Sequence, residues 1–367
     1  MCPLALELKK HSKRFETIVC VTGQHRDMLD QALAPFGVIP DVNLNVMKDD
    51  QDVFDITKSV LDGMQQVLKT VLPDVVLVHG DTTTSMAAAL SAFYLHIPVG
   101  HVEAGLRTYD LSRPWPEEMN RQLIGRIADY HYCPLPGNKD NLLKENVNGK
   151  ILVTGNTVID ALTYIINKMK VDDKAHLVCS KSILDAGYDC ERLKEGKRLI
   201  VITSHRRENI GHPLLSVLDA LEDLTNEYRD ADFVFLVHLN PHVRSTVEQR
   251  VEALTRHDNL YFIEPLDYLS FVYLMWKSYL ILTDSGGIQE EAPYIGRPVL
   301  VMRDTSERTE SISIGSSRLV GTESTKIIRE VKSLIEDRSC YEKMTSPSDL
   351  YGDGKASQRI VESLKEI

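Results

Sequence analysis

The sequence predicts an α/β protein with two Rossmann-like domains that face a central cleft. Short apolar runs alternate with amphipathic helical stretches throughout, which is typical of parallel sheets built from βαβ units. A more polar stretch at 171–197 interrupts the alternation once, and the pattern then resumes. The length of 367 residues also favours two domains, because a single core usually stops growing at about 250–300 residues.

The first half contains five apolar runs that we expect to be strands, with helices between them. Pro73 and Gly80 bracket the second run, and Pro98 opens the third, where a missing N–H is best tolerated. A helix is expected to begin at about Thr82. The expected strands are 17–21, 75–78, 98–102, 130–133 and 151–153.

The polar stretch marks the expected domain junction, and the run RLIVITSH begins the second series. Five strands are again expected with helices between them. These strands are 199–203, 233–237, 260–263, 280–283 and 299–301.

Composition and charge exclude several classes of function. The formal net charge of −11 and the pI of about 5.6 argue against nucleic-acid binding, which needs a basic face. No segment approaches the roughly 18 apolar residues of a membrane span. Glu7, Lys9 and Lys10 come too early for a secretory apolar region, so a cytoplasmic protein is expected.

No metal site is expected. The six cysteines are widely scattered and form no CxxC pair, so we expect them to be reduced and structural. His238 and His242 are four residues apart, but Pro241 between them disfavours a continuous helical face that could hold a metal.

Acidic residues follow several of the expected strands. Asp81 and Glu103 come directly after apolar runs, and in an open α/β sheet the ligand crevice lies at that end of the strands. Glu117 and Glu118 follow Pro116. Each acid also has an ordinary structural interpretation, with Asp81 as a helix N-cap and the Pro–Glu–Glu run as a helix opening. Only the four acidic residues taken together favour an enzyme.

The run ILTDSGGIQEEA predicts a strand, a tight turn and a helix. Gly286 and Gly287 allow close approach of a ligand, and the free N–H groups of the next helix suit a diphosphate. Ser285, Glu290 and Glu291 favour a nucleotide there over a turn without a ligand. The absence of GxGxxG argues against a nicotinamide or flavin cofactor, and the absence of GxxxxGK[ST] excludes a P-loop.

Cationic residues follow the expected strand 199–203. His205, Arg206 and Arg207 supply the donors that phosphate recognition needs, although a helix entry with solvated arginines has the same pattern. Arg303 and Arg308 either add charge to this site or pair with nearby acids on the surface.

Taken together, the motifs resemble the bacterial non-hydrolysing UDP-N-acetylglucosamine 2-epimerases. The resemblance extends from Cys2 to Ile367. Its motifs, in chain order, are HGDTTT, PVGHVEAGLRT, PWPEEMNR, TGNTVIDAL, HRREN, VHLNP, LTDSGGIQEEAP, GRPVLVMRDTSER and YGDG.

The resemblance implies a glycosyltransferase-B-like architecture and the interconversion of UDP-GlcNAc and UDP-ManNAc without a cofactor. It implies anti elimination of UDP to 2-acetamidoglucal, followed by re-addition. It also implies a final helix that returns to the first domain. The expected domains are therefore 1–168 joined by the helix 356–367, and 169–355.

The same resemblance implies roles for individual residues. The implied catalytic residues are Asp81, Glu103, Glu117 and His205, and the implied nucleotide-binding residues are Phe271, Ser285, Gly286, Gly287, Glu291 and Arg308. It further implies a homodimer and a second UDP-GlcNAc bound as an activator. The candidates for that second site are Gln24, His25, Arg206 and His238, although Ser59 stands where an arginine is expected.

The chain departs from the family at its start. Members of the family begin with a strand and a turn that supplies an arginine and a lysine, and by resemblance both would precede Met1. Three alternatives to the epimerase remain open. One is a hydrolysing epimerase that releases ManNAc and UDP. Another is a retaining glycosyltransferase, in which Asp81, Glu103 and Glu117 would have no clear task. The third is a non-catalytic protein that binds UDP-sugars.

Overall fold

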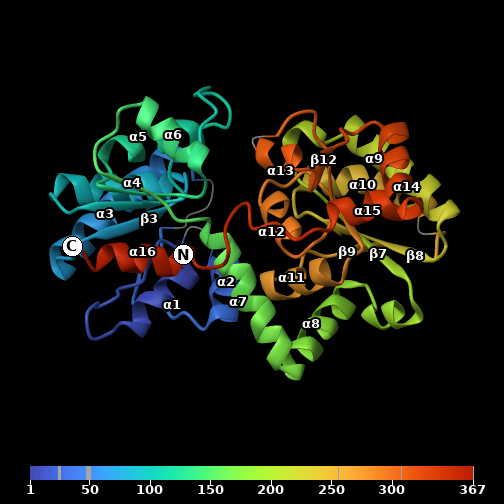
Figure 1. The fold of residues 1–367 in the computed structure, drawn as a ribbon, viewed down its shortest axis with the longest axis horizontal. Coiled ribbons are helices and arrows are strands. Elements are labelled where there is room, and N and C mark those ends of the chain that lie inside the picture. The colour runs from blue at the N-terminus through green and yellow to red at the C-terminus, as the bar shows by residue number, and fades with distance from the viewer. Residues whose placement is uncertain (24–25, 47–50, 255, 307, 367) are drawn as a thin grey trace. The chain divides into compact units, whose positions relative to one another are not determined.

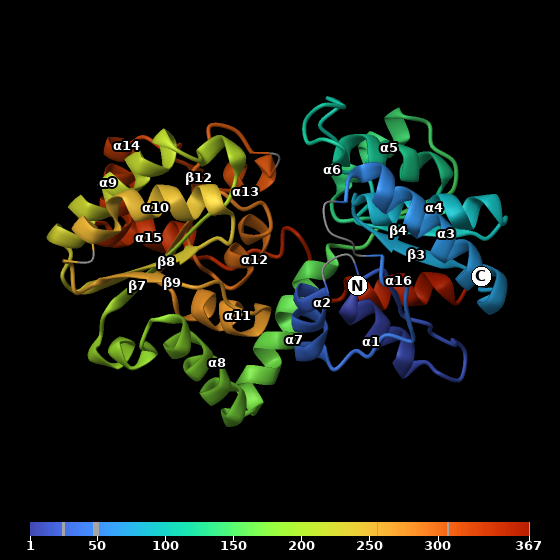
Figure 2. The same cartoon turned by 180° about the vertical axis from the view of Figure 1, so that it is seen from behind.

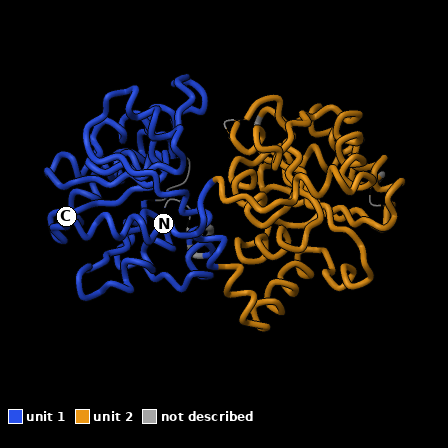
Figure 3. Tube along the Cα trace, in the orientation of Figure 1, with its two compact units in different colours: residues 1–164, 351–367 blue, residues 165–350 orange. Residues whose placement is uncertain are grey.

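The computed structural model describes residues 1–23, 26–46, 51–254, 256–306 and 308–366. The chain forms two compact units, coloured separately in Figure 3. Unit 1 comprises Met1–Tyr164 and Tyr351–Ile367, and unit 2 comprises Ile165–Leu350. Within the described part of the chain, no helix is long and apolar enough to cross a membrane.

Unit 1 contains a four-stranded parallel sheet in the order β3-β4-β5-β6. Its strands are β3 (Val76–His79), β4 (Val99–Val102), β5 (Tyr130–Cys133) and β6 (Lys150–Val153). A separate parallel pair is formed by β1 (Cys20–Val21) and β2 (Val42–Asn43). The expected strand at 17–21 is thus shorter than predicted, and β2 was not predicted because two residues form no apolar run.

The last helix of the chain packs against the first. Figures 1 and 2 show α16 (Ala356–Leu364) beside α1 (Cys2–Lys10) in unit 1. Leu4 and Leu8 of α1 share a core cluster with Ile360, Val361 and Leu364 of α16. The expected return of the final helix to the first half of the chain is therefore present.

The remaining helices of the first half lie between the strands, as the alternation predicts. They are α2 (Arg26–Leu33), η1 (Ala34–Phe36), α3 (Val53–Val71), α4 (Thr83–Tyr94), α5 (Glu117–Ile127) and α6 (Pro136–Lys144), with α7 (Thr157–Val171) continuing into unit 2.

Unit 2 is built on a six-stranded parallel sheet in the order β12-β11-β10-β7-β8-β9. From β7 the chain adds β8 and β9 on one side, and from β10 it adds β11 and β12 on the other side. The order of the strands therefore reverses between β7 and β10, which are neighbours in the sheet. Ligand crevices form at such a switch point, outside the carboxyl ends of the strands. The strands are β7 (Arg198–Ser204), β8 (Ala231–Val237), β9 (Leu260–Ile263), β10 (Leu280–Thr283), β11 (Val299–Val301) and β12 (Ser317–Leu319).

Helices cover both faces of this sheet. In Figures 1 and 2, α9, α10 and α14 lie on one face, and α11 with α8 lies on the other. A fully buried core of strand and helix side chains, including Ile200, Phe233 and Leu282, sits beneath the first group. Burial of each such side chain contributes about 1.5–3 kcal/mol to folding.

The helices of unit 2, apart from the continuation of α7, are α8 (Asp173–Ala186), η2 (Cys190–Glu195), η3 (Arg207–Asn209), α9 (His212–Glu227), α10 (Pro241–Leu254), α11 (Tyr268–Lys277), α12 (Ile288–Tyr294), α13 (Thr309–Ser313), α14 (Ser324–Glu336) and α15 (Arg338–Met344).

Candidate functional site

Asp81 and Glu103 lie together at the carboxyl ends of two adjacent strands of unit 1. The register of β3 and β4 pairs His79 with Val102, and the Gly80 N–H donates to the Val102 carbonyl at 2.9 Å. A Cβ atom on Gly80 would come within 3.1 Å of Glu103 Oε2. Both acids thus lie at the carboxyl ends of adjacent strands, as their place after apolar runs predicts.

Asp81 is not the N-cap of the helix that follows it, so its ordinary structural interpretation is wrong. The cap of α4 is Thr82, whose Oγ1 accepts from the Ser85 N–H at 3.2 Å. The Asp81 carboxylate instead binds Arg121 of α5, with Oδ2 at 2.8 Å from Nε and 2.6 Å from a terminal nitrogen. Arg121 therefore holds the Asp81 carboxylate at the end of β3, and Asp81 does not cap α4.

Arg121 also holds Glu118, whose side chain is fully buried one turn earlier on α5. Glu118 accepts further hydrogen bonds from the N–H groups of Thr108 and Tyr109 and from the Gln122 side chain. Burial alone would raise the pKa of Glu118, but these donors lower it below its ordinary value. Arg121 therefore links a buried structural carboxylate to Asp81.

We expect Arg121→Met to lower the free energy of unfolding by about 3 kcal/mol, because removal of one partner leaves a buried charge poorly compensated. Since Glu118 keeps its other donors, the loss falls at the low end of the range for broken buried pairs. Thermal unfolding measures it, with exposed Arg126→Met on the same helix as the matched control. Glu118→Gln added to Arg121→Met is expected to restore part of the loss. If Arg121→Met alone were as stable as the wild type, Arg121 would not be an important partner of the buried Glu118.

Glu103 and Glu117 have unusual surroundings. Glu103 has a positive φ of 64°, a strained conformation for a residue with a side chain, and such strain is concentrated at functional sites. Its Oε1 accepts from Asn156 at 3.3 Å, and its Oε2 lies 3.8 Å from His79 Nε2. Glu117 is the first residue of α5, as the helix-opening interpretation predicts, yet its buried Oε2 has no hydrogen-bond partner among the described residues.

His101 supports this turn from inside the sheet. Its ring is almost completely buried, and Nε2 lies 2.8 Å from the Gly80 carbonyl. Burial lowers the pKa of His101 to about 3, so the neutral ring donates through Nε2. His101 therefore fixes the backbone directly before Asp81, a role that the sequence pattern did not reveal.

Asp284 and His205 meet at the switch point of unit 2. The register pairs Thr283 of β10 with Thr203 of β7, so the residues that follow these strands lie close together. His205 Nδ1 is 3.0 Å from Asp284 Oδ1, and the His205 backbone N–H donates to the same carboxylate at 3.0 and 3.1 Å. His205 thus lies beside Asp284 at the carboxyl ends of β7 and β10.

The Asp284 side chain is fully buried and accepts three further hydrogen bonds. The donors are the Ser204 hydroxyl at 2.9 Å, the Arg206 N–H at 3.0 Å and the Asn209 side-chain amide at 2.9 Å. Burial alone would raise the pKa of Asp284, but the hydrogen bond and charge of His205, with the other donors, lower it. Asp284 therefore stays ionised although it is buried.

Of the four candidates for a second site, Gln24 and His25 lie outside the described residues. His238 stacks on His205, with ring centroids 5.7 Å apart, and Arg206 is the next residue along the chain from His205. The structure thus brings His238 and Arg206 to the end of β7.

The glycine turn after β10 is shaped by Arg308. A Cβ atom on Gly286 would come within 3.2 Å of the Arg308 guanidinium carbon, so glycine is needed for this approach. Arg308 Nε donates to Glu290 Oε1 at 2.9 Å, and both side chains are largely buried. Arg308 therefore lies beside the glycine turn and has a largely buried acidic partner. Arg303 Nε lies 3.2 Å from Oε1 of Glu208, whose side chain is 56% exposed.

Glu291 is buried against α11. Tyr268, at the start of that helix, donates its hydroxyl to Glu291 Oε1 at 2.5 Å. Burial raises the pKa of Glu291 to about 7, although the Tyr268 hydrogen bond opposes this shift. Phe271 lies one turn further along α11 and is partly exposed. Glu291 and Phe271 thus both lie near the N-terminal end of α11.

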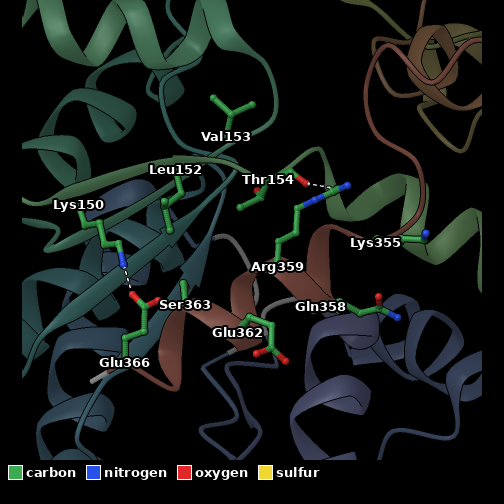
Figure 4. Close-up of a pocket in the computed structure, with 10 residues that line it drawn as sticks. All are labelled: Lys150, Leu152, Val153, Thr154, Lys355, Gln358, Arg359, Glu362, Ser363 and Glu366. Carbon is green, nitrogen blue, oxygen red and sulfur yellow. Dashed lines mark hydrogen bonds and ion pairs between the residues drawn. The ribbon is translucent and has the colours of Figure 1, made fainter.

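Figure 4 shows a pocket of about 510 Å³ elsewhere in unit 1, between β6 and α16. Lys150 pairs with Glu366 across it, and Arg359 donates to the Thr154 carbonyl. None of the predicted site residues lines it. Its lining residues are Lys150, Leu152, Val153, Thr154, Lys355, Gln358, Arg359, Glu362, Ser363 and Glu366. In the part of the chain that is described, no group of three or more potential metal ligands occurs.

Comparison with known proteins gives a consistent result. The family model described as UDP-N-acetylglucosamine 2-epimerase matches residues 7–365. The UDP-N-acetylglucosamine 2-epimerase of Escherichia coli K12 is 48% identical over 366 residues, covering 100% of this chain and 94% of that protein. The Campylobacter jejuni enzyme is 49% identical over 347 residues, covering 94% and 89%.

The crystal structure of UDP-GlcNAc 2-epimerase from Neisseria meningitidis bound to UDP-GlcNAc matches with a TM-score of 0.91. It is 45% identical, and the match covers 100% of this chain and 96% of that one. The expected fold class, α/β with two parallel-sheet domains of the glycosyltransferase-B-like type, is confirmed. The chain belongs to the UDP-N-acetylglucosamine 2-epimerase family.

Proposed function

We propose that this chain interconverts UDP-GlcNAc and UDP-ManNAc by anti elimination of UDP and re-addition. The observation that supports it most is the family match over residues 7–365, together with the 48% identity to the UDP-N-acetylglucosamine 2-epimerase of Escherichia coli K12. The Neisseria meningitidis relative binds UDP-GlcNAc, which is the ligand that this reaction requires.

The chemistry needs a base, a proton donor and a stabilised leaving group. A base removes the proton from carbon 2, and the bond from carbon 1 to the diphosphate oxygen breaks, with its electrons leaving on UDP. UDP then adds back to carbon 1 of 2-acetamidoglucal while a proton enters carbon 2 from the opposite face. Asp81, Glu103 and Glu117 are the proposed acid–base residues. Asp81 and Glu103 follow adjacent strands of unit 1, and Glu117 begins α5, whose Arg121 binds Asp81.

Unit 2 is the proposed nucleotide-binding domain. His205 is placed at the diphosphate, where positive charge would favour departure of UDP. Glu291 is placed at the ribose hydroxyls, since a buried carboxylate is a strong acceptor. Phe271, Ser285, Gly286, Gly287 and Arg308 complete the proposed nucleotide-binding set.

Regulation and assembly extend the proposal. A second UDP-GlcNAc would bind at Arg206 and His238, with Gln24 and His25, and the chain would act as a homodimer. The functional domains would be 1–168 with 356–367, and 169–355.

Proton NMR of UDP-GlcNAc in deuterated water tests the reaction directly. We expect deuterium at carbon 2 together with signals of UDP-ManNAc. Release of ManNAc and UDP would instead establish a hydrolysing epimerase. Binding of UDP in calorimetry with no deuterium at carbon 2 would establish a non-catalytic UDP-sugar-binding protein and overturn the proposal.

A further inference from the structure

The two ring nitrogens of His205 have different surroundings. Nδ1 faces the buried carboxylate of Asp284 at 3.0 Å, whereas no described residue forms a hydrogen bond with Nε2. The side chain is 37% exposed, and its nearest ring is that of His238. The imidazole is therefore anchored at one nitrogen and accessible at the other.

The carboxylate determines which nitrogen carries the fixed proton. An ionised carboxylate can only accept hydrogen bonds, so Nδ1 must donate. The His205 backbone N–H binds the same carboxylate, which restrains the ring at both its root and its Nδ1 edge. Such a second partner sets the tautomer of a histidine and the direction of its free nitrogen.

We propose that Asp284 is a positioning residue for His205: it accepts the Nδ1–H and so directs Nε2 to the diphosphate of the nucleotide sugar. The identity of the ligand rests on the function proposed above, but the ring geometry does not. Asp284 itself does not touch the ligand in this arrangement and acts through His205.

The contacts of Asp284 also suggest a purely structural role, since Ser204, Arg206 and Asn209 all donate to it. The two roles predict different results. If Asp284 only joins β7 to β10, its replacement changes stability and leaves the tautomer of His205 unchanged. If it positions the ring, the tautomer and the rate constant both change in protein that remains folded.

The first experiment uses the wild-type chain labelled with ¹⁵N in its histidine rings, with His205 assigned from the spectrum of His205→Gln. At a pH high enough to neutralise the ring, we expect the signals of an Nδ1–H tautomer. Because diphosphate oxygens accept hydrogen bonds, addition of UDP is expected to favour a proton on Nε2 and so to shift the Nε2 signal more than the Nδ1 signal. An Nε2–H tautomer would overturn the proposal without any variant of Asp284 being made.

The second experiment compares Asp284→Asn with the matched control Ser204→Ala, which removes another donor to the same carboxylate. We expect Asp284→Asn to alter the His205 tautomer and lower kcat by roughly 10–100-fold, with a smaller change in KM. Ser204→Ala should retain the tautomer and most of the activity. Folded Asp284→Asn with wild-type kcat would refute positioning. A wild-type chain without epimerase activity would instead refute the proposed function, while the ring spectrum would still test the geometry.

Discussion

Asp81→Asn is expected to lower kcat for the interconversion of UDP-GlcNAc and UDP-ManNAc by about 10²–10⁴-fold, the usual contribution of general acid–base catalysis. Asparagine keeps the size of the side chain but loses the charge that Arg121 binds. It can neither take a proton from carbon 2 nor return one. Because Thr82 supplies the cap of α4, the helix itself should remain intact.

Two rates separate the possible roles of Asp81. Exchange of the carbon 2 proton with deuterated solvent reports proton removal, and the appearance of the epimer reports net inversion. Asp62→Asn, an exposed carboxylate on α3, is the matched control. Wild-type exchange in Asp81→Asn would exclude Asp81 as the base, and the same assays on Glu103→Gln and Glu117→Gln would then rank the other two carboxylates.

Glu291→Gln is expected to stabilise the protein at pH 8 by up to about 3 kcal/mol and to weaken UDP binding. Burial raises the pKa of Glu291 to about 7 from an ordinary 4.5, so the folded state retains a proton that the unfolded chain releases. A difference of this size corresponds to about 3 kcal/mol. The contribution of this group is fully favourable below pH 4.5 and is lost as the pH rises to 7.

Thermal unfolding of both proteins from pH 4.5 to 8 measures this effect. The wild type should lose stability across that range relative to Glu291→Gln, and the two curves should converge at the acidic end. Tyr268→Phe is the companion variant, because loss of its hydrogen bond should raise the pKa of Glu291 further. Parallel pH curves for Glu291→Gln and the wild type would contradict the buried, proton-retaining carboxylate.

Calorimetry with UDP measures the opposing effect of the same substitution. Loss of a charged acceptor at the ribose should cost about 1.5–3 kcal/mol, which is roughly a 10–100-fold weaker Kd. A variant that is more stable yet binds less tightly would show that Glu291 is kept for ligand binding at the expense of stability. Unchanged affinity would remove Glu291 from the proposed nucleotide site.

Most strands could be predicted because each is a short, mainly apolar run. Strands β5, β9, β10 and β11 have the expected bounds, although His131 lies within β5 and Thr283 ends β10, because strands of a parallel sheet covered by helices are predominantly apolar. The short strand β12 was not predicted, because it is a partly exposed edge strand of three residues. The polar stretch at 171–197 was interpreted as an interruption, yet it contains α8, whose buried side chains form only a narrow stripe.

The candidate site could be predicted in part for a related reason. Asp81, Glu103 and His205 follow apolar runs, so their place at the strand ends can be read from sequence order. The residues that hold them come from other elements: Arg121 is 40 residues from Asp81, and Asp284 is 79 residues from His205. A single sequence does not reveal such pairings, because they depend on strand register and helix packing.

The path of the final helix has a consequence for how the protein is made. Asp160 of α7 accepts hydrogen bonds from the N–H groups of Ala356 and Ser357, and α16 then completes the core cluster around Leu4. During synthesis, unit 1 leaves the ribosome first but waits for the last residues of the chain to complete its core, while the whole of unit 2 is translated in between. The half of the protein that is synthesised first is therefore the last to be finished, and a ribosome that stops just after residue 350 leaves unit 1 incomplete although all of unit 2 has been made.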